Sequence, residues 1–214
     1  MRITNTMITL NIASYKYGHL AAHAVESALC QTVPFDVIRI YDDGIGDCGH
    51  LKDLYPQIEV IERPENVGPV ANFQDALDRT ETEWCMMLGA DNFLRPDTLE
   101  HLTKHDADII SYDIALFGTQ LEKTRRRVPI DRVEFGYPIW HFTEGNINIG
   151  NYIHGSSLYR TDKAKEIGYK GRPEPPYEED HYLFKGMLNS GATHIHVDEP
   201  LLMYRRHDYN FNQH

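Results

Sequence analysis

A lone carboxylate stands at the end of one apolar run in this chain. The run Met86–Leu88 is followed by Gly89, Ala90, Asp91 and Asn92. A strand that ends on a carboxylate places it at the C-terminal edge of a sheet, where open α/β sheets bind ligands. Carboxylate oxygens suit Mg²⁺ or Mn²⁺, which keep positions open for phosphate oxygens. Asp91 is therefore a candidate metal ligand, and the alternative is a residue that only caps the turn.

Acidic residues at two further places fit either a structural or a chemical role. Asp42 and Asp43 follow an apolar stretch and precede a glycine. This indicates a turn, or a carboxylate that hydrogen-bonds a nucleobase or ribose. Glu178–Asp180 opens a predicted helix, where the helix dipole alone favours acids. Asp180 lies one turn before Phe184 on the apolar face, so its side chain is expected to point inward. A general base there would contribute about 10²–10⁴ in rate.

Basic residues near the end of the sequence could meet an anion or a metal. Arg205 and Arg206 suit bidentate pairing with phosphate, or they simply lie on the surface. His207 is either a metal ligand or an ordinary structural histidine. The run Arg125–Arg127 is typical of a solvated charged segment.

The elements that would position these residues alternate between strands and helices. Apolar residues at helical spacing predict a helix over 19–30, which Pro34 ends. Strands are predicted at 7–12, 36–41, 58–61 and 84–88, and further helices at 51–55 and 70–77. Such an alternation builds βαβ units, so the expected fold is α/β with a mostly parallel sheet.

The second half of the sequence is less regular. Extended pieces are predicted at 108–112, 115–117, 156–159, 194–197 and 201–204, and helices at 161–166 and 178–189. The polar stretch 120–137 is predicted to be a surface excursion. No segment resembles a long linker, so residues 1–214 are expected to form one domain.

Composition excludes several classes of protein. The chain has 214 residues, 41% hydrophobic and 25% charged, which is typical of a globular protein. Its net charge of −11 argues against a nucleic-acid partner. No apolar run approaches the roughly 20 residues of a membrane span, and three cysteines without a CxxC spacing indicate a reducing compartment. Cys30 and Cys85 lie in apolar segments and are expected to be buried, and the expected location is the cytoplasm.

The order of these signals resembles glycosyltransferase family 2, whose members are inverting enzymes with the GT-A fold. The loop after the first strand contains Ser14 and Tyr15, and the second strand ends in Asp42, Asp43 and Gly44. By resemblance, this loop and these carboxylates line the nucleotide pocket. Tyr15 and Asp43 take the nucleobase-contacting roles.

Two more elements extend the resemblance through the first half. Asn66, Gly68 and Asn72 match an Asn-x-Gly-x-x-x-Asn element that shapes the pocket. The family's Asp-x-Asp metal motif falls on Gly89, Ala90 and Asp91, with glycine in place of the first acid. The resemblance implies that Asp91 ligates Mn²⁺ or Mg²⁺ and that Ala90 lies beside the donor.

The resemblance continues in the second half. Glu179 and Asp180 match a Glu-Asp-x-x-Leu helix in which the Asp is the catalytic base. Arg205 and His207 match a Tyr-Arg-x-His segment, whose histidine reaches the metal or diphosphate in some members. The segment between the metal strand and the base helix is expected to contact the acceptor, with His154 and Gly155 as candidates.

The resemblance implies a metal-assisted, inverting transfer of sugar from a nucleotide-diphosphate sugar to an acceptor hydroxyl. Residues 1–97 would form the nucleotide-sugar and metal half, and 98–214 the acceptor and base half. The implied role is the synthesis of cell-surface polysaccharide or glycoconjugate, with a glycan or lipid-linked acceptor. One alternative is a non-catalytic nucleotide-sugar or glycan-binding module, which Gly89 favours. The other is a sugar nucleotidyltransferase, although only Lys16 and Gly18 represent its basic, glycine-rich loop. The sequence is also compatible with a homo-oligomer.

Overall fold

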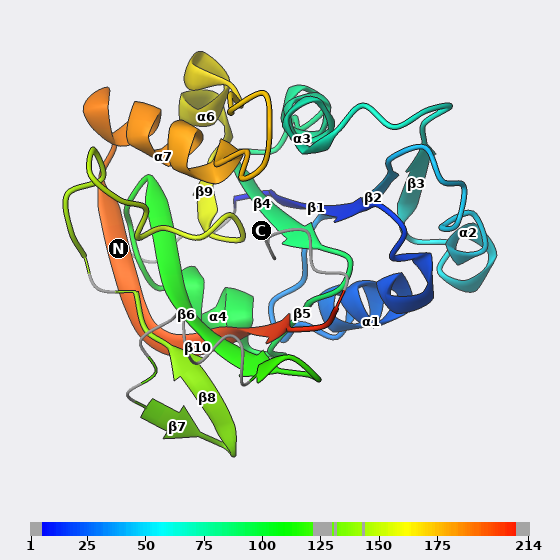
Figure 1. Cartoon of the computed structure of the whole chain (residues 1–214), viewed down its shortest axis with the longest axis horizontal. Coiled ribbons are helices and arrows are strands. Elements are labelled where there is room, and N and C mark those ends of the chain that lie inside the picture. The colour runs from blue at the N-terminus through cyan, green and yellow to red at the C-terminus, as the bar shows by residue number, and fades with distance from the viewer. Residues whose placement is uncertain (1–5, 122–129, 131, 143, 209–214) are drawn as a thin grey trace.

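One twisted sheet separates two groups of helices in the computed structural model (Figure 1). The structure describes residues 6–121, 130, 132–142 and 144–208. The strands are β1 (Ile8–Ser14), β2 (Val37–Asp42), β3 (Glu59–Glu62), β4 (Trp84–Gly89), β5 (Phe93–Leu94), β6 (Ile109–Phe117), β7 (Arg132–Glu134), β8 (Tyr137–Trp140), β9 (Leu158–Arg160) and β10 (His194–Arg205). The helices are α1 (Gly18–Leu29), α2 (Leu51–Leu54), α3 (Pro69–Asp78), α4 (Thr98–Leu102), α6 (Thr161–Ile167) and α7 (Glu179–Asn189).

The strands follow the order β3-β2-β1-β4-β9-β6-β10-β5, and the β7–β8 hairpin extends from β6. The first four strands are parallel, as the βαβ pattern predicts. In their register, Ser14 pairs with Asp42, and Ala13 pairs with Gly89. The carboxyl ends of β1, β2 and β4 therefore meet at one edge of the sheet, where the candidate residues lie.

Both faces of the central strands are buried, which explains their continuous apolar sequences. On β4, Trp84, Met86 and Leu88 belong to a core with apolar residues of α1, α2 and α4. Cys85 and Met87 point the other way, into a core with residues of α3, α6 and α7. This alternation follows the two-residue period of a strand. Figure 1 shows the two groups of helices on opposite sides of the sheet.

The second half contains two long strands where the sequence predicted four shorter pieces. Strand β6 continues through Asp113, whose buried carboxylate has hydrogen-bond partners on β7 and β10. Strand β10 continues past Pro200 with register shifts on both sides of it. Part of the polar stretch 120–137 forms the β7–β8 hairpin, whereas the arginine run at 125–127 lies outside the described residues.

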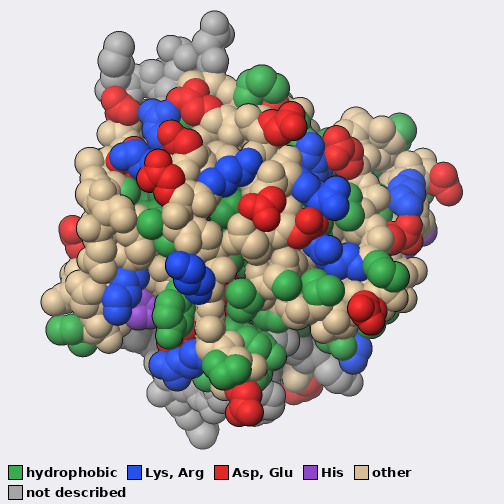
Figure 2. Space-filling model, turned by 90° about the horizontal axis from the view of Figure 1, so that it is seen from above, with side chains coloured by type: hydrophobic (Ala, Val, Ile, Leu, Met, Phe, Trp, Pro, Cys, Tyr) green, Lys and Arg blue, Asp and Glu red, His purple; other side chains and the backbone are tan. Residues whose placement is uncertain are grey.

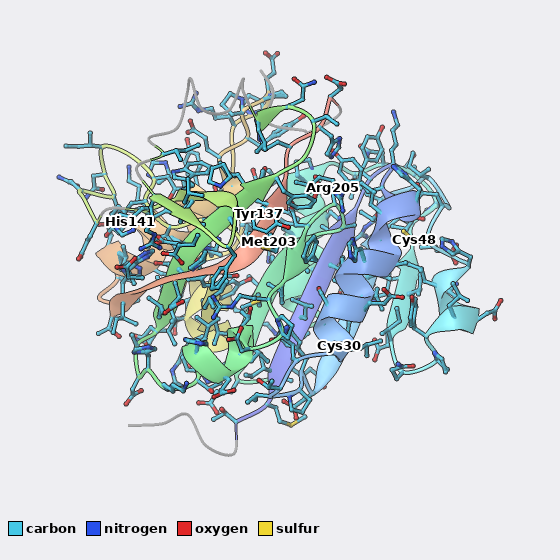
Figure 3. The ribbon with its side chains drawn as sticks, turned by 90° about the horizontal axis from the view of Figure 1, so that it is seen from below. Cys30, Cys48, Tyr137, His141, Met203 and Arg205 are labelled. Carbon is cyan, nitrogen blue, oxygen red and sulfur yellow. The ribbon has the colours of Figure 1, made fainter. Side chains whose placement is uncertain are left out.

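The sheet is continuous between the two predicted halves, because β5 pairs with β10 and β4 pairs with β9. The boundary between 97 and 98, and the single domain, remain predictions. The expectation for Cys85 is confirmed, but the one for Cys30 is wrong, because Cys30 is exposed where α1 ends (Figure 3).

The exterior is polar on the side that carries α6 and α7. Lys and Arg side chains are interspersed there with Asp and Glu (Figure 2). Among the described residues, no helix combines the length and the apolar character that crossing a membrane requires.

Candidate active site

Asp43 joins the end of β2 to the loop before α3. Its Oδ1 accepts a hydrogen bond from the backbone N–H of Val67 (2.9 Å). Its Oδ2 accepts from the Asn66 side-chain amide (3.0 Å) and from the Gly68 N–H (3.1 Å). The structure thus brings three predicted site residues, Asp43, Asn66 and Gly68, into one hydrogen-bonded unit.

The Asp42 carboxylate stabilises the turn that follows β2. It accepts backbone N–H bonds from Ile45, Gly46 and Cys48, at 2.9–3.1 Å. The turn that Asp-Gly sequences favour is therefore present. Gly44 makes the turn feasible, because it has a φ of +80° and a Cβ there would lie 2.2 Å from the carbonyl carbon of Glu65. The nucleotide-binding role of Asp42 stays a prediction.

Asn72 positions a cation that the sequence interpretation missed. Its Oδ1 accepts a hydrogen bond from Arg63 Nε (2.9 Å), and Arg63 also pairs with Asp75 (2.7 Å). The guanidinium lies 3.9 Å from the Asp43 carboxylate. Arg63 directly follows β3, and that position at the carboxyl edge of the sheet could have identified it.

Strand β10 braces the turn that holds Asp91. Arg205 donates its backbone N–H to the Asn92 side chain and its Nε–H to the Asp91 carbonyl, each at 2.9 Å. The buried Asp91 carboxylate lies 2.9 Å from Asn92 Nδ2 and 3.2 Å from His207 Nε2. The two predicted metal ligands, 116 residues apart in sequence, therefore present a carboxylate oxygen and an imidazole nitrogen at one place.

Gly89 leaves room for this arrangement. A Cβ at this position would lie 2.8 Å from Asp91 Oδ1 and 2.9 Å from Asn92 Nδ2. A carboxylate at position 89 would thus displace the hydrogen bond between those two side chains. Ala90 is buried, and its N–H continues the pairing with β1 through the Ala13 carbonyl.

Asp180 lies in the first turn of α7, beside the loop that contains Gly155. Its Oδ1 accepts a hydrogen bond from the His181 N–H (2.7 Å). A Cβ at Gly155 would lie 3.4 Å from Asp180 Cβ and 3.6 Å from its Oδ2, so the two predicted residues are neighbours. Burial raises the pKa of Asp180. Burial and the adjacent Asp180 raise the pKa of Glu179 to about 7.

Tyr204 precedes Arg205 near the end of β10. Burial raises the pKa of Tyr204, and the negative charges of Asp91 and Asp180 raise it further. Tyr204 stands in the same short segment as His207, but only its neighbours were singled out from the sequence.

His154 has a structural role in the described contacts. Its Nε2–H donates to the Tyr112 carbonyl (2.9 Å), and its ring packs edge-on against the Tyr112 ring. Burial lowers the pKa of His154 to about 3, so the imidazole is neutral. Ser14 is buried at the end of β1, and the half-buried Tyr15 ring lies beneath the Lys16 ammonium group (4.8 Å).

A model of the family described as Glycosyl transferase family 2 matches residues 9–168. The chain belongs to glycosyltransferase family 2. The matched residues include Asp43 and Asp91 and end before Asp180 and His207. The roles of all four residues stay predictions.

Solved structures share the fold with this family 2 chain. TarS 1–349 from S. aureus matches with 19% identity and a TM-score of 0.69, over 93% of this chain and 60% of that one. The same protein in complex with UDP-GlcNAc matches with 17% identity and a TM-score of 0.69, over 94% and 59%. The mannosyltransferase PcManGT from Pyrobaculum calidifontis, in complex with GDP-Man and Mn²⁺, matches with 14% identity and a TM-score of 0.66, over 96% and 59%.

These likenesses confirm the predicted α/β fold with a mostly parallel sheet, of the GT-A type. The chain spans about three fifths of the length of these three structures. A comparison with curated protein sequences finds no match.

Proposed function

We propose that this domain transfers a sugar from a nucleotide-diphosphate sugar to an acceptor hydroxyl, with inversion at the anomeric carbon. The observation that carries the proposal is the pairing of the Asp91 carboxylate with the His207 imidazole at the carboxyl edge of the sheet, at 3.2 Å. A second carboxylate, that of Asp180, lies in the first turn of α7, where burial raises its pKa. Membership of family 2 and the nucleotide sugars bound in two of the similar structures support this proposal.

The donor nucleotide would bind where β1, β2 and β4 end. Tyr15 offers a ring at this edge, and Asp43 holds the loop beside it while presenting its carboxylate to the base. Arg63 keeps a positive charge close to this carboxylate. Because the whole chain carries a net charge of −11, such local cations matter for an anionic ligand.

Asp91 and His207 fit a divalent metal. Their ligand atoms lie 3.2 Å apart, and Arg205 fixes the backbone of the Asp91 turn. An imidazole beside a carboxylate favours Mn²⁺ over Mg²⁺, since Mg²⁺ prefers oxygen ligands alone. Bound there, the metal would neutralise the charge that develops on the leaving diphosphate.

Asp180 would act as the general base. Burial raises the pKa of Asp180 toward neutral pH. A general base is most effective when its pKa lies near the pH at which the enzyme works. The carboxylate would remove the proton of the acceptor hydroxyl, whose oxygen attacks the anomeric carbon opposite the leaving group. The acceptor would lie along residues 146–157, where Gly155 leaves space beside Asp180. A glycan or lipid-linked acceptor of cell-surface polysaccharide or glycoconjugate synthesis fits this reaction.

Thermal denaturation with a panel of nucleoside diphosphates and Mn²⁺ tests the proposal. A ligand at about 100 times its Kd stabilises the fold by about 2.7 kcal/mol, which raises the Tm by roughly 5–10 °C in a domain of this size. We expect one nucleotide to give such a shift with Mn²⁺, and Asp91→Asn to abolish it. If no nucleoside diphosphate raises the Tm, the proposal is wrong.

A non-catalytic nucleotide-sugar-binding module is the second candidate. Gly89 favours this candidate, because it replaces the first acid of the metal motif. The Asp91 and Asn92 side chains lie where a side chain at position 89 would begin. A module of this kind would bind the nucleotide sugar with Mn²⁺ but would neither hydrolyse it slowly nor pass the sugar to any acceptor. Donor consumption, followed by chromatography over hours, distinguishes the two candidates.

A further inference from the structure

A second group of metal-type donors lies away from the Asp91 turn. Asp113 on β6, His141 after β8 and His196 on β10 each offer one ligand atom, and these atoms lie within 4.8 Å of one another. Strand β6 pairs with both β8 and β10, so three neighbouring strands supply the donors. Figure 3 shows His141 well apart from Arg205, which braces the Asp91 turn.

The donor atoms are spaced like the ligands of one cation. Asp113 Oδ1 lies 2.9 Å from His196 Nε2 and 3.1 Å from His141 Nδ1. Ligands held about 2.0–2.1 Å from a tetrahedral Zn²⁺ lie about 3.3–3.4 Å apart, a few tenths of an ångström more than these two distances. The Asp113 side chain is fully buried, so water does not compete for its carboxylate.

Ser111 orients the His196 ring. Its Oγ lies 2.8 Å from His196 Nδ1 and 2.8 Å from His194 Nε2. A hydroxyl has one proton, so Ser111 donates to one imidazole and accepts from the other. When it accepts from His196 Nδ1–H, the Nε2 lone pair faces Asp113 Oδ1, so both atoms can act as ligands of one cation. Metal-bound histidines are held by outer hydrogen bonds of this kind.

The surrounding charge also favours a cation. Arg132 pairs with Asp113 Oδ2 (2.7 Å), with Glu134 (2.8 Å) and with Asp198 (2.5 Å). One guanidinium among three carboxylates leaves two negative charges when the imidazoles are neutral, and a divalent cation would balance them. Arg132 pairs with Oδ2 and His196 Nε2 faces Oδ1, while His141 Nδ1 lies 3.0 Å from Oδ2 and 3.1 Å from Oδ1.

We propose that Asp113, His141 and His196 bind one divalent transition-metal cation of the zinc type, independently of the nucleotide. Two imidazoles and one carboxylate suit Zn²⁺ better than Mg²⁺ or Ca²⁺, which prefer oxygen ligands. The cation would connect β8 to β6 and β10 and so hold the β7–β8 hairpin against the sheet. The site stands on these residues alone and does not depend on the proposed sugar transfer.

Calorimetric titration of Zn²⁺ into chelator-treated protein, without nucleotide, tests this site. We expect one Zn²⁺ per chain, unchanged in Asp91→Asn, and a visible absorption band when Co²⁺ replaces it. Ser111→Ala should weaken Zn²⁺ binding by about 10–100-fold, since loss of an outer-shell partner has that effect. His141→Asn, at a position with 33% of the side chain exposed, should weaken it further.

His50→Asn, at an exposed position, is the control and should leave Zn²⁺ binding unchanged. Circular dichroism would verify that each variant is folded. The proposal is overturned if the wild type binds no Zn²⁺ or if His141→Asn binds it as tightly as the wild type. Loss of binding in Asp91→Asn would also overturn it, because Zn²⁺ would then occupy the nucleotide site.

Discussion

Replacing Asp43 with asparagine should destabilise the fold as well as weaken nucleotide binding. The Asp43 carboxylate is 3% exposed and accepts three hydrogen bonds from the loop 66–68. Asparagine has one acceptor oxygen, so at best its amide nitrogen would face the Val67 N–H while the other two bonds persist. A hydrogen bond to a charged group contributes about 1.5–3 kcal/mol, and a buried N–H without a partner adds a further cost. We expect a loss of about 2–3 kcal/mol.

The assay is thermal denaturation of Asp43→Asn beside Asp53→Asn, an exposed position on α2. At about 2–4 °C per kcal/mol for a domain of this size, Asp43→Asn should lower the Tm by roughly 4–12 °C. The free energy of unfolding of Asp53→Asn should stay within about 0.5 kcal/mol of the wild-type value, as is usual for surface substitutions. Equal Tm values for the two variants would show that Asp43 does not anchor the loop.

Three further predictions concern the same edge of the sheet. Gly44→Ala should lower the free energy of unfolding by at least about 1 kcal/mol more than Gly46→Ala does. Both glycines have a positive φ, but only a Cβ at position 44 would clash with backbone atoms. Equal denaturation midpoints for the two variants would contradict this prediction. His207→Ala should weaken Mn²⁺-dependent binding of a nucleoside diphosphate by at least about 10-fold, and His50→Ala should not; calorimetry with and without Mn²⁺ decides. The pKa of Glu179 is raised from 4.5 to about 7, so the folded state binds the extra proton and stability falls as pH rises through that interval. Glu179→Gln should reduce this loss of stability. Urea titrations at pH 5 and pH 7.5 measure it, and an equal difference in the free energy of unfolding between the two pH values in wild type and variant would refute the prediction.

The first half of the fold was predictable because its signals are local. Each strand from β1 to β4 is a short apolar run that ends at a polar loop, and helical spacing marks α1 and α3. Asp43 and Asp91 were found for the same reason, because strand ends are visible in a sequence. The parallel arrangement then brings those ends together.

The second half depended on contacts between residues far apart in sequence. Asp113 interrupts an apolar run, so the sequence alone predicts two short strands on either side of it. In the structure its histidine partners on β10 and after β8 satisfy the carboxylate, and the strand continues. A lone carboxylate inside such a run was itself a signal that buried partners exist. Arg63 belongs to the site through its contacts with Asn72 and Asp43, and no local pattern shows those contacts. Cys30 was misplaced because the apolar side of α1 ends just before it.

Steady-state transfer by Asp180→Asn tests most directly whether Asp180 is the general base. The enzyme would be given the donor and Mn²⁺ that the denaturation panel identifies, with Glu166→Gln, at an exposed position on α6, as the control. Loss of a general base should lower kcat by about 10²–10⁴, while calorimetry shows donor binding within a few-fold of the wild type. Transfer at the wild-type rate by Asp180→Asn would show that Asp180 is not the base.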